Sequence, residues 1–252
     1  MASGLSGKSV IVTGGGSGIG RAAVELLGAA GCIVTVADLN EAGGREIVAA
    51  VNERGPGRAH FVHADVTDEA SVRAMVRAAV AAAGRLDGAI NGAGIAQHAK
   101  PLHELEAAEW DACMNVNLRA VFLCMKYEIE AMLRTGGGSI VVISSVAAVL
   151  GLANSAEYCA SKAGVTGLVR AAAIDYAGSG IRVNAILPGA TRTPLAMRAL
   201  SMKPGGARPM PVPVGRMAEP VEIAHGAVWM LSDESSYMSG SCMTLDGGLS
   251  IA

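Results

Sequence analysis

The sequence is poor in charge and holds no long apolar run. Asp, Glu, Lys and Arg make up 17% of its 252 residues, and the net charge at pH 7 is −2. Soluble domains usually have about 25% charged residues. A net charge near zero gives no excess of basic residues, which would be expected in a protein that binds nucleic acid or an anionic membrane. Since no apolar run reaches the ~18 residues of a spanning helix, we expect no membrane segment. A surface with so few charges favours self-association.

Cysteine pairs and targeting signals are also lacking. The five cysteines, at positions 32, 113, 124, 159 and 242, form no C-x-x-C pair, and none lies near a histidine at metal-ligand spacing. An odd, unpatterned set is typical of reduced intracellular thiols. The opening MASGLSGKSVIVTG has no apolar h-region of a secretory signal. We therefore expect a cytoplasmic protein without a metal site.

Short apolar runs alternate with helical periodicity along the whole chain. The strand-like runs are 8–14, 32–38, 59–65, 86–92, 138–145, 181–189 and 242–248. Continuous apolar strands indicate a sheet covered on both faces. Regular β-α alternation predicts parallel strands with right-handed crossovers. We expect a single α/β domain over residues 1–252, a Rossmann-type doubly wound sheet of seven parallel strands with helices on both faces.

A glycine-rich loop, TGGGSGIG (13–20), joins the first strand to the first helix. Gly14, Gly18 and Gly20 would let the backbone approach a pyrophosphate, and the helix N-terminus would supply free N–H groups. We expect Ser17 and Ile19 of this loop to bind the cofactor too. With 33 glycines in the chain, the spacing alone is weak, but its place between strand and helix strengthens it. A turn without a ligand is the alternative.

Asp38 ends the second predicted strand, 18 residues after Gly20. A carboxylate there can accept both hydroxyls of an adenosine ribose and would repel a 2′-phosphate. Neither Ser17 in the loop nor Asn40 offers a positive charge. These features favour NAD over NADP. The alternative is an ordinary helix N-cap, a role open to Asp38 or Asn40.

A tyrosine and a lysine stand one helical turn apart in EYCASKAG (157–164). Helical spacing places Tyr158 and Lys162 on one face, with Cβ atoms ~5–6 Å apart. A lysine charge ~4 Å away at an effective dielectric near 20 offers ~4 kcal/mol, and each pKa unit of a phenol takes ~1.4. Lys162 is therefore predicted to make Tyr158 a working base, helped by an oxidised nicotinamide nearby.

A serine pair ends the fifth predicted strand. Ser145 lies 13 residues before Tyr158, at the strand end where such folds bind ligands. Its hydroxyl could hold a substrate oxygen beside the phenol. Ser144 is the competitor, since strand alternation turns only one of the two toward the site.

Together these features resemble the short-chain dehydrogenase/reductase family over essentially the whole chain. The motifs that carry the resemblance are TGGGSGIG, Asp38, DV (65–66), NGAG (91–94), NVN (115–117), Ser145, YCASK (158–162), PGATRTP (188–194) and the DGG near the C-terminus. The resemblance implies a catalytic group of Asn117, Ser145, Tyr158 and Lys162, and its 13-residue interval selects Ser145 over Ser144. One departure is Gly92, where the family usually has Asn or Ser.

The resemblance also implies contacts to the cofactor. Lys162 would bind the nicotinamide ribose, and Asn117 would support a water-mediated proton path to it. Asp65 and Val66 would meet the adenine. The remaining implied contacts are Asn91, Ala93 and Gly94 after strand four, and Pro188, Gly189, Thr191 and Thr193 near the carboxamide.

The implied activity is oxidation of a secondary alcohol by NAD, without a metal. Patterns such as LCMKYEIEAM and GAVWMLSD are similar to family members acting on cyclic alcohols and diols. The alternatives are an NAD(P)H-dependent reductase of ketones or 3-oxoacyl thioesters, and a non-enzymatic nucleotide-binding scaffold. Pocket shape is expected to depend on the loop 95–103 and on 195–217. We expect His98 and His103 in that loop to be solvated.

The segment 195–217 is rich in Pro, Gly and Met. It is expected to be a substrate lid, with a disordered loop as the alternative; Met-rich apolar surface suits an oily substrate. The helical stretch 107–134 carries apolar residues on more than one face, so a partner subunit is expected to cover it. Family resemblance implies a homotetramer.

Overall fold

Seven parallel strands form one sheet in the order β3-β2-β1-β4-β5-β6-β7. The computed structural model describes residues 3–201 and 212–252. Its strands are β1 (Ser9–Thr13), β2 (Ile33–Asp38), β3 (Arg58–His63), β4 (Gly88–Asn91), β5 (Gly138–Ile143), β6 (Ile181–Pro188) and β7 (Cys242–Leu245). The predicted doubly wound parallel sheet is confirmed. Its winding reverses between β1 and β4, the position at which such sheets bind ligands.

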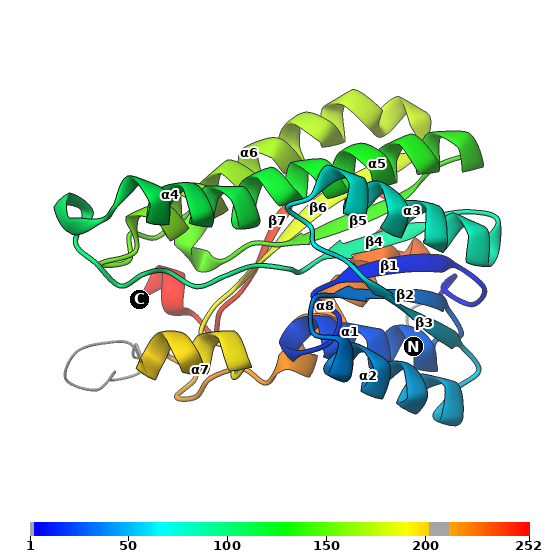
Figure 1. The fold of residues 1–252 in the computed structure, drawn as a ribbon, viewed down its shortest axis with the longest axis horizontal. Coiled ribbons are helices and arrows are strands. Elements are labelled where there is room, and N and C mark those ends of the chain that lie inside the picture. Colours follow the sequence, from blue (N-terminus) through cyan, green and yellow to red (C-terminus); the bar gives the residue numbers. More distant parts are fainter. Residues whose placement is uncertain (1–2, 202–211) are drawn as a thin grey trace.

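Helices cover both faces of this sheet (Figure 1). One layer holds α3 (Glu69–Ala83), α5 (Ala120–Thr135) and α6 (Ala156–Tyr176), and the other holds α1 (Gly18–Ala29), α2 (Glu41–Arg54) and α8 (Pro220–Leu231). A separate cluster of buried apolar side chains lies under each layer. All five residues of β1 are buried, because a central parallel strand is covered on both sides.

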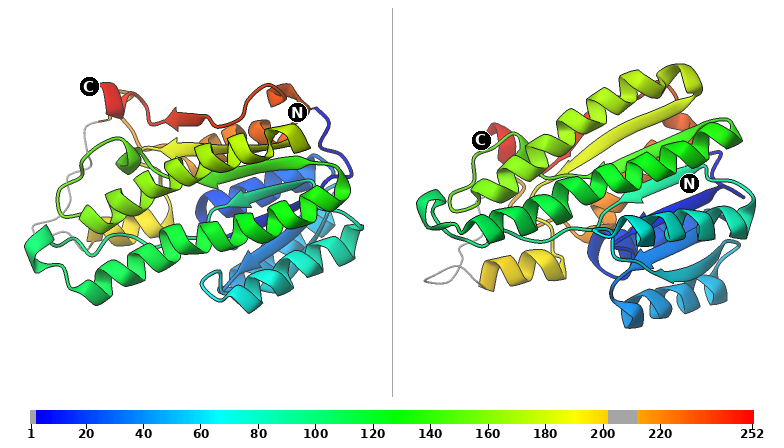
Figure 2. Two further views of the ribbon diagram at one scale, coloured as in Figure 1. Left: turned by 90° about the horizontal axis from the view of Figure 1, so that it is seen from above. Right: turned by 45° about the horizontal axis from the view of Figure 1, so that its top comes forward.

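The helix predicted over 107–134 is not one regular helix. It consists of α4 (Ala107–Met114), a π-helical turn over Asn115–Arg119, and α5. Figure 2 shows these pieces following one another along one side of the molecule. A π-helical turn inserts a residue into the helical ladder and often marks a functional position; here it carries Asn117.

The predicted lid, 195–217, is only partly described. Its first residues belong to α7 (Pro194–Ser201), which lies beside the sheet's carboxyl edge (Figure 1). Residues 202–211 of the predicted lid lie outside the described residues.

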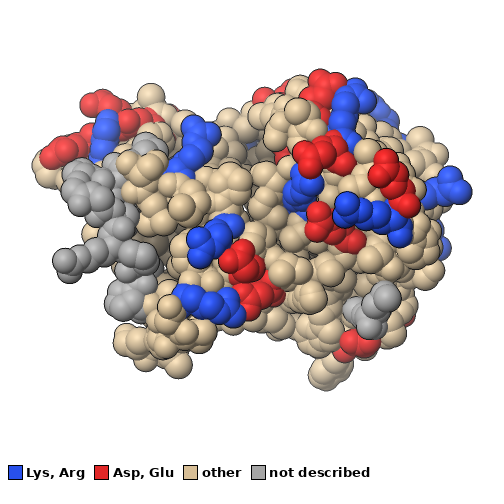
Figure 3. Space-filling view, turned by 90° about the horizontal axis from the view of Figure 1, so that it is seen from below, with Lys and Arg blue, Asp and Glu red and all other residues tan. Residues whose placement is uncertain are grey.

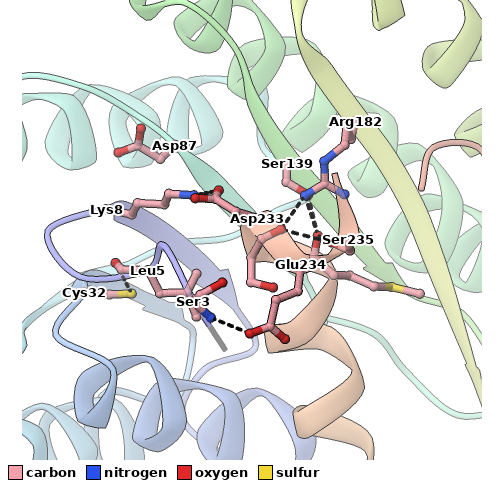
Figure 4. A network of polar contacts seen from close by, with 12 residues as sticks. Ser3, Leu5, Lys8, Cys32, Asp87, Ser139, Arg182, Asp233, Glu234 and Ser235 are labelled. Carbon is pink, nitrogen blue, oxygen red and sulfur yellow. Dashed lines mark hydrogen bonds and ion pairs between the residues drawn. The ribbon is translucent and has the colours of Figure 1, made fainter. Parts of the chain in front are cut away.

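A polar network closes the opposite, amino edge of the sheet (Figure 4). The Arg182 guanidinium on β6 donates to the carbonyls of Met230, Ser232 and Met238 at 2.8, 3.2 and 3.1 Å. Ser139 on β5 donates to the Met230 carbonyl at 2.9 Å. Since the last carbonyls of a helix lack intrahelical donors, this network caps α8 and fixes it to β5 and β6.

The face seen in Figure 3 carries acidic and basic side chains close together. Ion pairs on the helices of that side and the segment before α8 include Arg21–Glu46 at 2.7 Å and Arg216–Glu222 at 2.7 Å. Among residues 3–201 and 212–252, none of the helices combines the length and apolarity needed to cross a membrane.

Candidate active site

A cleft of about 740 Å³ runs along the carboxyl edge of the sheet. Small-molecule sites commonly measure ~300–1,000 Å³. The predicted site residues that line it are Gly14, Ser17, Gly18, Ile19, Gly20, Asp38, Asp65, Val66, Ala93, Gly94, Ser145, Tyr158, Lys162, Pro188, Gly189, Thr191 and Thr193. Asn91 and Asn117 do not line it and are buried behind it.

The glycine loop is shaped for close approach to an anion. A Cβ on Gly20 would lie 2.2 Å from the Gly14 carbonyl oxygen, so no larger residue fits this turn. Ser17 stands at the N-cap of α1, but its side chain caps none of the helix N–H groups, and the first turn holds no acidic side chain. Those N–H groups and the positive end of the helix dipole are therefore available to a phosphate. The loop fits a dinucleotide pyrophosphate.

Asp38 faces the cleft with its carboxylate fixed by the backbone. Its Oδ2 accepts from the Gly16 N–H and its Oδ1 from the Asn40 N–H, both at 2.8 Å. The cap of α2 is Asn40, whose side chain accepts from the Gly43 N–H at 3.2 Å. Because each carboxylate oxygen offers further lone pairs, Asp38 can still accept ribose hydroxyls.

Asp65 and Thr193, also in the predicted cofactor site, are held in place by hydrogen bonds to nearby residues. Asp65 Oδ1 accepts from the Thr67 N–H and hydroxyl at 2.9 and 2.7 Å, and these bonds lower the pKa of Asp65. Thr193 accepts from the Ala196 N–H at 3.1 Å, at the start of α7. The methyl of Thr193 lies 3.2 Å from the position of a Cβ on Gly18, so the start of α7 and the glycine loop flank the same part of the cleft.

The structure separates Ser144 from Ser145, although both line the cleft. Ser144 donates its hydroxyl proton to the Lys162 carbonyl at 3.0 Å, which attaches the end of β5 to α6. Ser145 accepts from the Ala147 N–H at 3.1 Å and keeps its own proton for another partner. Its hydroxyl is close enough to Tyr158 to influence the pKa of that phenol. The catalytic role of Ser145 stays a prediction.

Tyr158 and Lys162 both face the cleft from α6, and burial is the largest influence on the pKa of each. Lys162 Nζ lies 5.7 Å from the Tyr158 ring centroid and donates to the Ile143 carbonyl at 3.2 Å. Burial raises the pKa of Tyr158 above its ordinary value, and hydrogen bonding to Ser145 acts against this rise. Burial also lowers the pKa of Lys162 to about 8. These pKa directions belong to the chain without cofactor, so the predicted activation of Tyr158 by Lys162 beside a bound nicotinamide stays a prediction.

Asn117 holds the segment that follows β4. Its Oδ1 accepts from the Ile95 N–H at 2.8 Å, and its Nδ2 donates to the Ile95 carbonyl at 3.0 Å. A Cβ on Gly94 would lie 3.0 Å from Asn117 Oδ1 and 3.8 Å from Lys162 Nζ. The backbone at Gly94 therefore lies close to both side chains, and a larger residue there would press on Asn117.

Asn91 points away from the cleft. Its Nδ2 donates to Glu128 Oε2 on α5 at 2.8 Å, and both side chains are buried. The turn after it is held by Thr13, whose hydroxyl accepts from the Gly92 N–H at 3.1 Å. This bond ties the turn to β1, although position 92 departs from the family pattern.

His98 is a partly exposed loop residue, 28% exposed, that also contacts a buried glutamate. Its N–H and its ring Nδ1 contact Glu157 Oε1 at 2.8 and 3.3 Å. Glu157 is fully buried and immediately precedes Tyr158, so this contact fixes the loop after β4 beside the phenol. His103 is largely exposed, as predicted.

One wall of the cleft consists of residues that motif spacing did not identify. They are mostly apolar and lie after β4, after β5, on α7 or after it: Ile95, Ala96, Gln97, Val146, Leu152, Ala153, Leu195, Ala199, Leu200 and Met217. Several fall in the segments 95–103 and 195–217, which were expected to shape the pocket. Apolar loop residues follow no fixed spacing, so only their proximity to the motifs could have indicated them.

In the described part of the chain, no group of three or more His, Cys, Asp or Glu side chains could hold a metal ion. The polar side chains at the centre of the cleft are instead those of Ser145, Tyr158 and Lys162. A hydroxyl, a phenol and an ammonium can bind a substrate oxygen and exchange its proton, which is general acid–base chemistry.

Comparison with known proteins agrees with this geometry. A family model described as Enoyl-(Acyl carrier protein) reductase matches residues 14–250. The chain is 48% identical over 248 residues to 2,5-dichloro-2,5-cyclohexadiene-1,4-diol dehydrogenase of Sphingobium indicum, covering 97% of each chain. It is 40% identical to cis-4-hydroxycyclohexanecarboxylate dehydrogenase of Sinomonas cyclohexanicum, covering 98% of each.

A solved structure of levodione reductase superposes with a TM-score of 0.94 at 38% identity, covering 98% of this chain and 99% of that one. The matches span the sheet, the cleft and both helical layers. The chain therefore belongs to the short-chain dehydrogenase/reductase family and is an oxidoreductase of that family.

Proposed function

We propose that the protein is an NAD-dependent dehydrogenase of secondary alcohols, with cyclic or apolar alcohols as its substrates. The observation that carries this proposal is the meeting of Ser145, Tyr158 and Lys162 with the glycine loop in one cleft. A binding scaffold would need the loop but not a phenol and an ammonium beside a serine hydroxyl. The family's Asn–Ser–Tyr–Lys group supports the same conclusion.

The cofactor end of the cleft fits a dinucleotide and favours NAD. The glycine loop would hold the pyrophosphate and Asp38 the adenosine ribose. Two arginines on the helices beside Asp38 are engaged with glutamates: Arg21 with Glu46 and Arg45 with Glu41. A 2′-phosphate would therefore meet a carboxylate rather than an uncommitted guanidinium. When bound, NAD supplies the acceptor for the hydride that leaves the carbinol carbon.

Proton transfer falls to Tyr158. Ser145 and Tyr158 would hold the hydroxyl oxygen of the alcohol, and the phenolate of Tyr158 would take its proton. Burial raises the pKa of Tyr158, so the phenol stays neutral until positive charge gathers beside it. Lys162, whose pKa is about 8, carries charge at neutral pH and contributes part of it. In the reverse direction the neutral phenol would protonate a ketone.

Asn117 would act through position rather than contact. Its side chain amide is committed to Ile95, so the predicted water-mediated path to Lys162 would have to use the backbone of the π-helical turn. The bonds to Ile95 would also keep Gly94 against the cofactor. Asn117 is thus a positioning residue for both the cofactor and Lys162.

The substrate wall suits a compact apolar ring. Its aliphatic side chains, such as Leu152 and Leu200, surround few polar groups, among them Gln97. Both relatives described above are named for dehydrogenation of a ring alcohol. In α7, Leu195, Ala199 and Leu200 contribute to this wall, so this described part of the predicted lid would cover the ring.

The direct test is a panel of secondary alcohols with NAD, followed by the absorbance of the reduced cofactor. We expect cyclohexanol and cyclohexanediols to be oxidised, and Tyr158→Phe to abolish the signal while still binding the cofactor. No turnover with any ring alcohol, or unchanged turnover in Tyr158→Phe, would refute the proposal.

The second candidate is a reductase of 3-oxoacyl thioesters, suggested by the description of the family model. A carrier protein would require basic side chains at the cleft mouth. The segment 195–217 has four basic residues. Arg216 is held by both carboxylate oxygens of Glu222 at 2.7 Å, Arg198 lies in the last turn of α7, and Lys203 and Arg208 lie outside the described residues. Turnover of an acetoacetyl thioester with NADH, in preference to a ring alcohol with NAD, would favour this candidate.

The protein is further proposed to be a cytoplasmic homotetramer. Met114, Leu118, Phe122 and Leu168 line an apolar hollow on the outer side of α4, the π-helical turn, α5 and α6. Phe122 and Leu133 are 45% and 48% exposed. A second copy of the same helices would cover this face.

A further inference from the structure

Glu128 and Asn91 form a buried polar pair that the proposed mechanism does not use. Glu128 on α5 is fully buried, and Asn91 at the end of β4 is 2% exposed. Asn91 Nδ2 donates to Glu128 Oε2 at 2.8 Å. The other oxygen of each side chain, Glu128 Oε1 and Asn91 Oδ1, is buried and has no hydrogen-bond partner.

Glu128 Oε1 and Asn91 Oδ1 are both hydrogen-bond acceptors, so they cannot bond to each other unless one of them carries a proton. A carboxylate only accepts hydrogen bonds, whereas a carboxylic acid adds one donor. An unpaired buried charge is costly, so such groups are neutralised instead. A single proton on Glu128 would remove the charge and give both oxygens a partner.

We propose that Glu128 is a neutral carboxylic acid at pH 6, donating its proton from Oε1 to Asn91 Oδ1 and closing a two-bond ring. The ring makes Glu128 a positioning residue for the cofactor site, because Asn91 is the last residue of β4 and leads into the cleft-lining residues Gly92, Ala93 and Gly94. It fixes the floor of the cleft to α5.

The surroundings of Glu128 support the neutral form. Burial raises the pKa of Glu128 to about 7, and the hydrogen bond from Asn91 acts against this rise. The titratable group facing it on its own helix is Cys124, a buried thiol whose pKa is also raised by burial. On the helix packed against α5, Glu69 of α3 is engaged with Lys126 and Tyr127 at the outer surface. Among the described residues, no charged side chain comes within ion-pair distance of Glu128.

The proton on Glu128 makes the stability of the fold depend on pH. An unfolded glutamate titrates near ~4.3, so the folded chain holds a proton that the unfolded chain has lost. Stability from this group is therefore greatest below the unfolded pKa and is lost as pH rises through about 7. Glu128→Gln keeps the ring, since its amide can donate to Oδ1 and accept from Nδ2, and it removes the titration.

The test is an infrared difference spectrum between the wild-type chain and Glu128→Gln. We expect the wild type at pH 6 to show a carboxylic-acid carbonyl band that Glu128→Gln lacks and that fades as pH rises past about 7. Glu130→Gln is the matched control: it also removes one carboxylate from α5, but Glu130 is exposed and paired with Arg134, so the band should persist. If the wild type shows no such band at pH 6, Glu128 is ionised and the proposal is overturned.

Thermal unfolding gives an independent readout. Glu128→Gln should unfold several degrees above the wild type at pH 9 and close to it at pH 5. Cofactor affinity measured by binding should fall between pH 6 and pH 9 more steeply in the wild type than in Glu128→Gln. Parallel pH profiles for both chains would contradict a titrating Glu128. Neither readout depends on which alcohol is oxidised.

Discussion

At the residue scale, the proposed base is a phenol that its surroundings keep neutral. Tyr158 lies where burial raises its pKa, and the nearest ammonium, that of Lys162, is bound to the Ile143 carbonyl. A neutral phenol resists ionisation until the cleft is loaded. Tyr158 would therefore act as a base only in the complex that contains both cofactor and alcohol.

Asp38 is expected to decide between NAD and NADP. In Asp38→Ala, turnover with NAD should fall about 10- to 100-fold, since a hydrogen bond to a charged group is worth ~1.5–3 kcal/mol. The NADP to NAD preference should rise, because repulsion of the 2′-phosphate is removed. The check is kcat/KM with each cofactor, and an unchanged ratio would contradict the role of Asp38.

Lys162 should be costly to the fold in the absence of cofactor. Burial lowers its pKa from 10.5 to about 8; at ~1.4 kcal/mol per pKa unit, Lys162→Met should gain roughly 1–3 kcal/mol of stability at pH 7. Because this pKa is lowered on folding, the penalty is fully present below pH 8 and fades as pH rises toward 10.5.

Urea unfolding of both chains at pH 7 and pH 10 measures this penalty. The gap between Lys162→Met and the wild type should narrow at the higher pH, while Lys162→Met loses turnover throughout. A gap that stays constant with pH would show that the ammonium carries no burial cost.

At the element scale, the junction of β1 and α1 leaves no room for a side chain at Gly20. Gly20→Ala would bring a Cβ to 2.2 Å from the Gly14 carbonyl oxygen. Overpacking of this kind costs ~1–3 kcal/mol, and the displaced loop should no longer bind the dinucleotide. Fluorescence of bound NADH and a denaturant titration are the measurements.

The control for this substitution is Gly178→Ala. Gly178 follows α6, has a negative φ and has no atom within 4 Å of an added Cβ, so its replacement should leave affinity and stability almost unchanged. Equal effects at both glycines would mean that backbone flexibility, rather than the tight turn, governs the loop.

The elements themselves could be predicted well from local sequence. Apolar runs identified all seven strands, and Asn40 was one of two expected caps for α2. The π-helical turn was not predicted, because the apolar residues of 107–134 follow α-helical periodicity through Asn117. Whether a helix admits an extra residue depends on what its side chains meet after packing, here the backbone of Ile95.

The hydrogen bonds that hold the segments around the site could not be predicted from the sequence, because they join residues far apart in the chain. Asn91 and Glu128 are 37 residues apart, and His98 and Glu157 are 59 apart. Tyr158 and Lys162, by contrast, are one helical turn apart, so their proximity to each other could be predicted. Their pKa values could not, since burial comes from the sheet and the loops around α6.

At the scale of the whole molecule, the apolar face of α4, α5 and α6 predicts assembly. Phe122 is 45% exposed and lines the hollow with Leu118 and Leu168. Phe122→Glu would bury a carboxylate in an interface between copies, so the tetramer expected by light scattering should dissociate into smaller species.

A charge change elsewhere distinguishes assembly from general destabilisation. Glu53→Lys alters an exposed residue of α2 in the other helical layer, and it should leave the molar mass unchanged. A wild-type chain that is monomeric at micromolar concentration would contradict the proposed tetramer.

The central claim is that positive charge gathered in the cleft turns a buried, neutral phenol into a base. Ultraviolet titration of tyrosinate in the wild type, with Tyr158→Phe subtracted, measures this phenol directly. Without cofactor, the pKa of Tyr158 should lie above its ordinary value of about 10, and with NAD bound it should fall. A Tyr158 pKa that does not change when NAD binds would contradict the account.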